Sequence, residues 1–137
     1  MSAIRPNRDQ FVALMGAPDD GPVVMLNLVK YKERADDGNG SGGDAYRRYG
    51  DQAVQMVEAR GGKVLWAGQA EQVLIGNPSE DWDAVFVVQY PSRAAFVEMV
   101  TTPEYEKAHE HREAGLERTT LLACRPMLDR FTEGKAG

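Results

Sequence analysis

The chain has 137 residues, 42% of them hydrophobic and 27% charged, which suits one domain with its own core. Sixteen Lys and Arg are spread among twenty-one Asp and Glu, giving a net charge of −5 and no basic stripe for nucleic acid. No apolar run approaches the roughly 18 residues of a membrane span, and Met1–Pro6 lacks the apolar stretch of a signal peptide. With Cys124 as the single cysteine, these features predict a cytoplasmic protein with no membrane or nucleic-acid partner.

A short helix is predicted ahead of the rest of the fold. Asn7 and Gln10 have the spacing of a capping box that begins it, and Gly16 followed by Pro18 ends it. We therefore expect three regions, namely a helical extension over residues 1–20, a domain over residues 21–127 and a tail over residues 128–137, frayed from Thr132.

The remaining elements follow the order β-α-β-β-α-β. Turn residues and apolar periodicity predict strands over Val23–Tyr31, Lys63–Ile75, Trp82–Tyr90 and Arg118–Cys124. They predict helices from Asp44 to Arg60, from Ser92 onward, and from Thr102 to Gly115. A bend or bulge is expected at Gly68. The order is that of a ferredoxin-like fold, in which the first and third strands are central.

Two of these strands are apolar on both faces. The runs Val23–Val29 and Ala84–Val88 lack the alternation of a strand with one solvated face, which indicates burial on both sides. The predicted helices suffice to cover one face of the sheet only. A second copy of the chain is the simplest cover for the other face, so the sequence predicts a homodimer.

Motifs that look like cofactor sites fail on spacing. Gly38–Gly43 reads G-x-G-x-x-G, but about six residues separate it from the preceding strand and acidic residues flank it. Read as a calcium loop, the same stretch places Arg48 where a bidentate Glu is needed. His109 and His111 are two positions apart on a helix, so they cannot share one ion. The sequence therefore predicts no metal and no organic cofactor.

Polar residues within the apolar strands are candidates for a ligand site. Asn27 interrupts the first central strand, and Asp83 stands at the start of the other. Such groups either find hydrogen bonds within the fold or across a dimer, or they anchor a ligand in an apolar pocket. Tyr49 and Trp66 would add a polar tip and an aromatic wall.

A set of short motifs resembles a known family. The motifs are Pro22–Lys30, Tyr46–Gly50, Gly61–Val64, Trp82-Asp83, Tyr90–Arg93 with Phe96, Pro103–Tyr105 and His111–Leu116. Together they resemble the domain-of-unknown-function family DUF1330, of the dimeric α+β barrel superfamily, over about Pro22 to Cys124. The resemblance implies an α+β, ferredoxin-like subunit with helices on one face of an antiparallel sheet. It also implies that the other face packs against a partner's sheet to form a barrel.

Two residues of the last motif add to the candidate site. His111 and Arg112 either pair with glutamates one turn away, or bind an anion or move a proton at the mouth of a cleft. The candidate pocket residues are therefore Asn27, Tyr49, Trp66, Asp83, His111 and Arg112.

Two functions remain open from the sequence. In the first, a homodimer binds a small organic molecule in an apolar pocket. In the second, a cofactor-independent enzyme of monooxygenase-like or isomerase- or lactonase-like type acts on a small aromatic or lactone-type metabolite, with a His or carboxylate moving a proton. The superfamily resemblance implies relatives of both kinds, so fold does not choose between them. The sequence shows no local acid–base arrangement, which favours binding.

Overall fold

The computed structural model describes residues 4–19 and 21–131, so residues 132–137 of the expected tail lie outside it. Its elements are α1 (Arg8–Gly16), β1 (Val23–Tyr31), α2 (Gly42–Ala59), β2 (Lys63–Gln69), the 3-10 turn η1 (Pro78–Glu80), β3 (Ala84–Tyr90), α3 (Arg93–Val100), α4 (Pro103–Gly115) and β4 (Leu116–Cys124). The strands form an antiparallel sheet in the order β2-β3-β1-β4. The predicted ferredoxin-like α+β fold is confirmed, with β1 and β3 at the centre.

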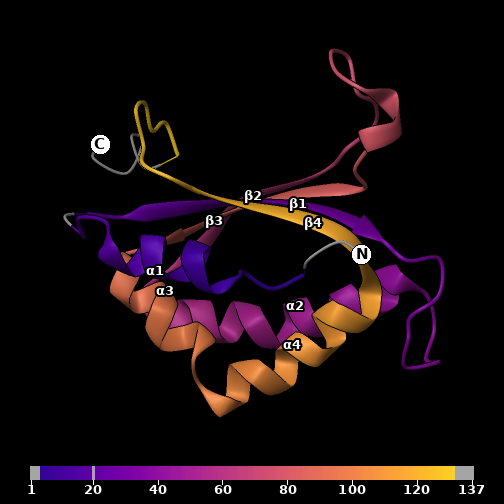
Figure 1. The fold of residues 1–137 in the computed structure, drawn as a ribbon, viewed down its shortest axis with the longest axis horizontal. Helices are drawn as coiled ribbons and strands as arrows, with labels where there is room; N and C mark the ends of the chain where they lie inside the picture. Colours follow the sequence, from indigo (N-terminus) through magenta and orange to yellow (C-terminus); the bar gives the residue numbers. More distant parts are fainter. Residues whose placement is uncertain (1–3, 20, 132–137) are drawn as a thin grey trace.

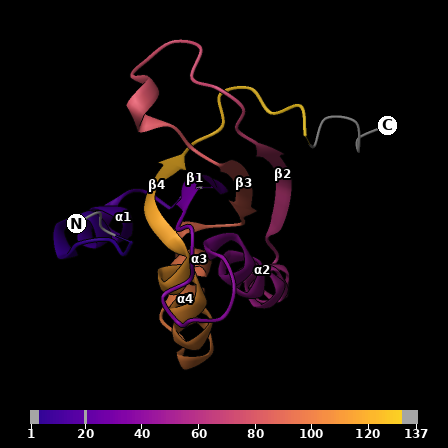
Figure 2. The ribbon, with the colours of Figure 1, turned by 90° about the vertical axis from the view of Figure 1, so that its right-hand side faces the viewer.

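The helices form a layer on one face of the sheet (Figure 1). Seen from the side, α2, α3 and α4 pack below the strands, while α1 lies beyond the β4 edge (Figure 2). None of the described helices is both long and apolar enough to span a bilayer. The capping box predicted at Asn7 and Gln10 is present, and Thr102 caps α4 with Pro103 in its first turn.

The sheet presents two different faces. Val23, Met25 and Val29 of β1 are buried against the helices, and Asn27 stands between them on this helix-covered face. The alternate residues, Leu26 among them, point to the opposite side because side chains alternate along a strand. The strand register places further apolar residues on this open face, which comprises Val24, Leu26, Leu28, Trp66, Val85, Val87 and Leu122.

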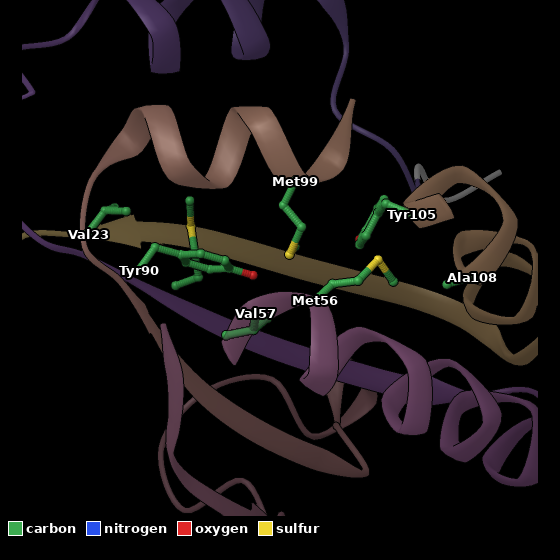
Figure 3. Packing of buried hydrophobic residues seen from close by; sticks show 8 residues of the cluster. Val23, Met56, Val57, Tyr90, Met99, Tyr105 and Ala108 are labelled. Carbon is green, nitrogen blue, oxygen red and sulfur yellow. The ribbon is translucent and has the colours of Figure 1, made fainter. Parts of the chain in front are cut away.

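The main core lies between the helix-covered face and the helices (Figure 3). Met56 of α2 and Met99 of α3 fill its centre and meet Tyr90 and Val23 from the sheet. Tyr105 of α4 closes one side of the same cluster. The flexible methionines therefore serve as core residues.

The prediction for the second strand was wrong in two respects. β2 ends at Gln69 and not at Ile75, and the chain then leaves the sheet in a long loop before β3. Leu74 and Ile75 in this loop are 82% and 93% exposed, so their apolar character does not reflect strand burial. The register shift lies between Val64 and Trp66, three residues before the predicted position at Gly68.

Candidate functional site

Arg112 of α4 lies inside the protein, with only 4% of its surface exposed. Its Nη1 donates a hydrogen bond of 2.9 Å to the backbone oxygen of Ile4, and its Nη2 donates one of 3.3 Å to Thr119 Oγ1. The guanidinium carbon stands 5.9 Å from the ring centre of Tyr49. All of these partners are uncharged, and no carboxylate among the described residues pairs with this buried cation. The glutamate pairing considered from the sequence is therefore absent from the described part of the chain.

Tyrosines surround this arginine. The hydroxyl groups of Tyr49 and Tyr105 share a hydrogen bond of 2.8 Å, and the ring of Tyr46 lies 5.3 Å from that of Tyr49. Burial raises the pKa of all three phenols, so they are neutral at pH 7. Burial alone would lower the pKa of Arg112, but the tyrosine oxygens raise it by more, so the guanidinium keeps its charge. We call Arg112, Tyr46, Tyr49 and Tyr105 the arginine–tyrosine cluster.

Asn27 lies next to this cluster on the sheet. It pairs across the strands with Phe86, and the Phe86 ring contacts that of Tyr46 at a centroid distance of 5.4 Å. The side-chain amide makes no hydrogen bond to the residues that the structure describes. Its position, on the helix-covered face and half-buried, suits a polar group that water or a ligand can reach.

Asp83 occupies a different place, at the end of the sheet. Its carboxylate accepts a hydrogen bond of 2.8 Å from the backbone N–H of Tyr31 and lies 3.6 Å from Lys30 Nζ. It also lines an open pocket of about 870 Å³ between the end of the sheet and the first turn of α2, which we call the sheet–helix pocket. This pocket includes Tyr31, Ser41, Gly43, Ala67, Gln69, Asp83, Ala84 and Phe86.

His111 lines a second hollow on the other side of Lys32. This α4 groove, of about 940 Å³, runs between α4, the loop after β1 and the N-terminal residues Ile4 and Arg5. Its wall is predominantly acidic, with the cations Arg5 and Lys32 and five carboxylates, those of Asp36, Asp37, Glu110, Glu113 and Glu117. His111 is therefore separated from Asn27 and Tyr49.

Trp66 lies on the open face of the sheet, away from the other candidates. It pairs across the strands with Val87, and its ring covers Gly68 so closely that a Cβ built there would lie 2.2 Å from it. Of the predicted site residues, the structure thus brings Tyr49 and Arg112 together, and Asn27 is linked to them through Phe86 and Tyr46. It places Asp83 in the sheet–helix pocket, His111 in the α4 groove and Trp66 on the far side.

Several residues of the site carry no signal in the sequence. Ile4 contacts Arg112 although 108 positions separate them, and Thr119 reaches the same guanidinium from β4. Tyr46 and Tyr105 lie in the motifs Tyr46–Gly50 and Pro103–Tyr105, but nothing in the sequence connects them to Arg112. Within residues 4–19 and 21–131, no group of three or more His, Cys, Asp or Glu side chains could hold a metal ion.

The fold and sheet order define an α+β subunit of ferredoxin-like type, and similarity in sequence is more specific. Residues 41–124 match the family described as "Domain of unknown function (DUF1330)", and the chain belongs to this family. A protein of unknown function from Rhodopseudomonas palustris is 42% identical over 94% of this chain and 100% of its own, with a TM-score of 0.87. Among curated proteins, none matches the chain.

More distant structures share the fold alone. A protein from Arabidopsis thaliana, 16% identical, matches 78% of this chain and 97% of its own with a TM-score of 0.57. A dabb family protein with a ferredoxin-like fold from Mesorhizobium loti, 18% identical, matches 80% of this chain and 100% of its own with a TM-score of 0.51. At such identities the likeness supports the topology and carries no function.

Proposed function

We propose that this protein is a homodimer that binds a small organic molecule in the sheet–helix pocket. The observation that carries the binding role is the composition of this pocket. Its inner wall is formed by Ala67, Ala84 and Phe86 from the helix-covered face of the sheet, and Tyr31 adds a further ring. Its volume of about 870 Å³ lies within the range of small-molecule sites, and its lining also includes the charged residues Lys30, Lys32, Glu33 and Glu117.

The polar group best placed to orient a ligand is Asp83. The Tyr31 N–H and the Lys30 ammonium hold its carboxylate from two sides, so its direction is fixed before a ligand arrives. A preorganised acceptor in an aromatic pocket suits a small aromatic molecule that carries a hydroxyl or amine donor. Burial and the nearby Asp83 charge raise the pKa of Tyr31, so this phenol keeps its proton and serves as a donor. An acceptor at Asp83 beside a donor at Tyr31 supports the binding of a ligand over the abstraction of a proton from it.

The open face of the sheet supports the homodimer. Its apolar residues include Trp66 of β2, which is 50% exposed, and Leu122 of β4 at the opposite edge. The loop after β2 and the chain after β4 both rise from this side of the sheet (Figures 1 and 2). They carry Leu74, Ile75, Met127 and Leu128, all largely exposed. An apolar face with apolar arms at both ends favours a second sheet as its cover.

Phenol is the probe for the pocket because its ring matches the walls and its hydroxyl can donate to Asp83. We expect isothermal titration calorimetry to show phenol binding to the wild-type protein. Ala67→Phe should abolish it, since Ala67 is an exposed wall residue and a ring there fills the pocket at little cost in stability. Ala123→Phe is the matched control, at an exposed alanine of β4 outside the pocket. Equal binding by both variants would refute the site.

A further inference from the structure

The N-terminal segment, residues 4–6, covers the buried Arg112. The backbone oxygen of Ile4 accepts the hydrogen bond from Arg112 Nη1, and the Ile4 side chain packs against the cluster of Val29, Tyr46 and Leu116. Arg5 then forms ion pairs with Glu106 and Glu113 on α4. The segment leads into α1, which lies outside the β4 edge (Figure 2). It therefore occupies the opening between β4 and α4.

A neutral carbonyl is a weak partner for a buried guanidinium. Removing a cation from water costs several kcal/mol unless an anion compensates it, and arginine bonds carboxylates through two parallel hydrogen bonds. Here the guanidinium donates to one carbonyl oxygen and to the Thr119 hydroxyl, interacts with the Tyr46 hydroxyl, and lies near an aromatic ring. All of these partners are neutral. A carboxylate at the position of the Ile4 carbonyl would supply the missing negative charge.

We propose that residues 4–6 are a displaceable cover and that Arg112 binds the carboxylate of a short branched aliphatic acid in place of Ile4. Ile4 itself indicates the shape of this ligand. Its carbonyl faces Arg112 and its sec-butyl side chain fills the apolar site beside Tyr46 and Leu116. The acid with the same carbon skeleton is 3-methylpentanoate. The site is separate from the sheet–helix pocket and does not depend on it.

The cover is held weakly enough to be displaced. The Arg5 ion pairs lie at the surface, where such pairs contribute little to stability. Ile4 also forms part of the wall of the α4 groove, so a ligand in that groove reaches the edge of the cover directly. A ligand in the groove lies within a Debye length of the groove's carboxylates and is repelled by them, so its binding depends on the attraction of Arg112 at contact distance.

The isoleucines of the chain permit a direct test. The sequence contains two, Ile4 in the cover and Ile75 at a position 93% exposed. In full-length protein labelled with ¹³C at the Ile δ1 methyl groups, 3-methylpentanoate should move the Ile4 signal toward that of an exposed methyl and leave the Ile75 signal in place. The neutral amide, 3-methylpentanamide, should move neither signal, because it lacks the charge that Arg112 recognises.

Variants test the two parts of the proposal separately. Ile4→Ala weakens the cover without changing charge and should tighten 3-methylpentanoate binding about tenfold in calorimetry. Ile75→Ala, the same substitution at the exposed position, should leave the affinity unchanged. Arg112→Gln should abolish binding of the acid, with circular dichroism confirming that the variant is folded.

The proposal fails if acid and amide act alike on wild-type protein, a result that does not depend on the folding of any variant. It also fails if the acid leaves the Ile4 signal unmoved at tens of millimolar. Ala67→Phe, which fills the sheet–helix pocket, should keep full affinity for 3-methylpentanoate. Loss of acid binding in that variant would instead place the acid in the sheet–helix pocket and refute the site at Arg112.

Discussion

The hydroxyl groups of Tyr49 and Tyr105 share a hydrogen bond of 2.8 Å that joins α2 to α4 in the interior. Removing one hydroxyl leaves the other buried without its partner, so Tyr49→Phe or Tyr105→Phe should each cost about 1–2 kcal/mol of unfolding free energy. The double variant should cost no more than either single one. Urea denaturation checks this, with Tyr31→Phe as control, because the Tyr31 hydroxyl makes no hydrogen bond to the described residues. Additive losses would contradict a shared bond.

Gly42 and Gly115 are predicted to tolerate no side chain. A Cβ at Gly42 would lie 2.2 Å from the Lys32 backbone oxygen, and one at Gly115 would lie 2.4 Å from the Gly42 oxygen. Either alanine substitution must separate the backbones where β1, α2 and α4 meet, and should cost more than about 2 kcal/mol. Gly50→Ala, within α2 and with nothing within 4 Å of its Cβ, should instead stabilise by about 0.5–1 kcal/mol. Denaturation midpoints compare the three, and similar losses at all sites would exclude the steric explanation.

His109 should make stability depend on pH in the mildly acidic range. Burial and the neighbouring Arg112 and Arg5 charges lower its pKa below 6.5, against the raising effect of its hydrogen bond to Glu113. The folded state therefore binds the proton less well than the unfolded state. Stability should be complete above about pH 6.5 and fall as the pH drops toward the lowered folded pKa, by about 1.4 kcal/mol for each unit of lowering.

His109→Phe should flatten this part of the pH profile measured by thermal unfolding. Interaction with Arg5 lowers the pKa of Glu106 and Glu113 despite burial, and the hydrogen bond to His109 lowers that of Glu113 further. The stability that these two carboxylates contribute is therefore lost only below about pH 4.5. This lower limb should remain in the variant. If the variant and wild type had the same profile in the mildly acidic range, the protonation of His109 would not be coupled to folding.

Asn27→Leu tests whether the amide belongs to the scaffold. The amide makes no hydrogen bond to the described residues, so we expect the variant to be as stable as wild type or more stable by about 1 kcal/mol. Thr119→Val is the contrast on the same face, because its hydroxyl donates to the Leu28 oxygen at 2.8 Å and accepts from Arg112. It should cost about 1–2 kcal/mol. A clear loss of melting temperature in Asn27→Leu would assign the amide a structural partner.

The proposed dimer can be tested at Trp66. Sedimentation of wild-type protein should give twice the subunit mass of 15.1 kDa. Trp66→Glu places a charge on the open face and should shift the protein to monomer at micromolar concentration. Val54→Glu, at an exposed site on the outer side of α2, should leave the dimer intact. A wild-type monomer, or a dimer in both variants, would reject the open face as the interface.

Much of the fold could be predicted from residue patterns. The apolar runs of β1 and β3 identified the central strands, and turn and cap residues placed the helices. The prediction extended β2 too far because it took the apolar residues Leu74 and Ile75 as part of a buried strand. Residue type alone does not distinguish an exposed apolar residue of a loop from a buried one of a strand.

The site was harder to predict, for two physical reasons. The extra residue Leu65 shifts the register of β2, and since side chains alternate, the shift turns Trp66 to the open face. The partners of Arg112 come from the N-terminal segment and from β4, and no local pattern links positions so far apart in the chain. The sequence indicated Tyr49 and Arg112 as separate candidates, but nothing in it showed that they are neighbours.

The bulge at Leu65 also bears on how such a strand can diverge. β2 is an edge strand, so loss of the bulged residue Leu65 would make its pairing with β3 continuous, with Trp66 still opposite Val87 and with β1, β3 and β4 in register. Trp66 would therefore remain on the open face. A single-codon deletion at the bulge could thus straighten this edge strand without exchanging the residues on its two faces.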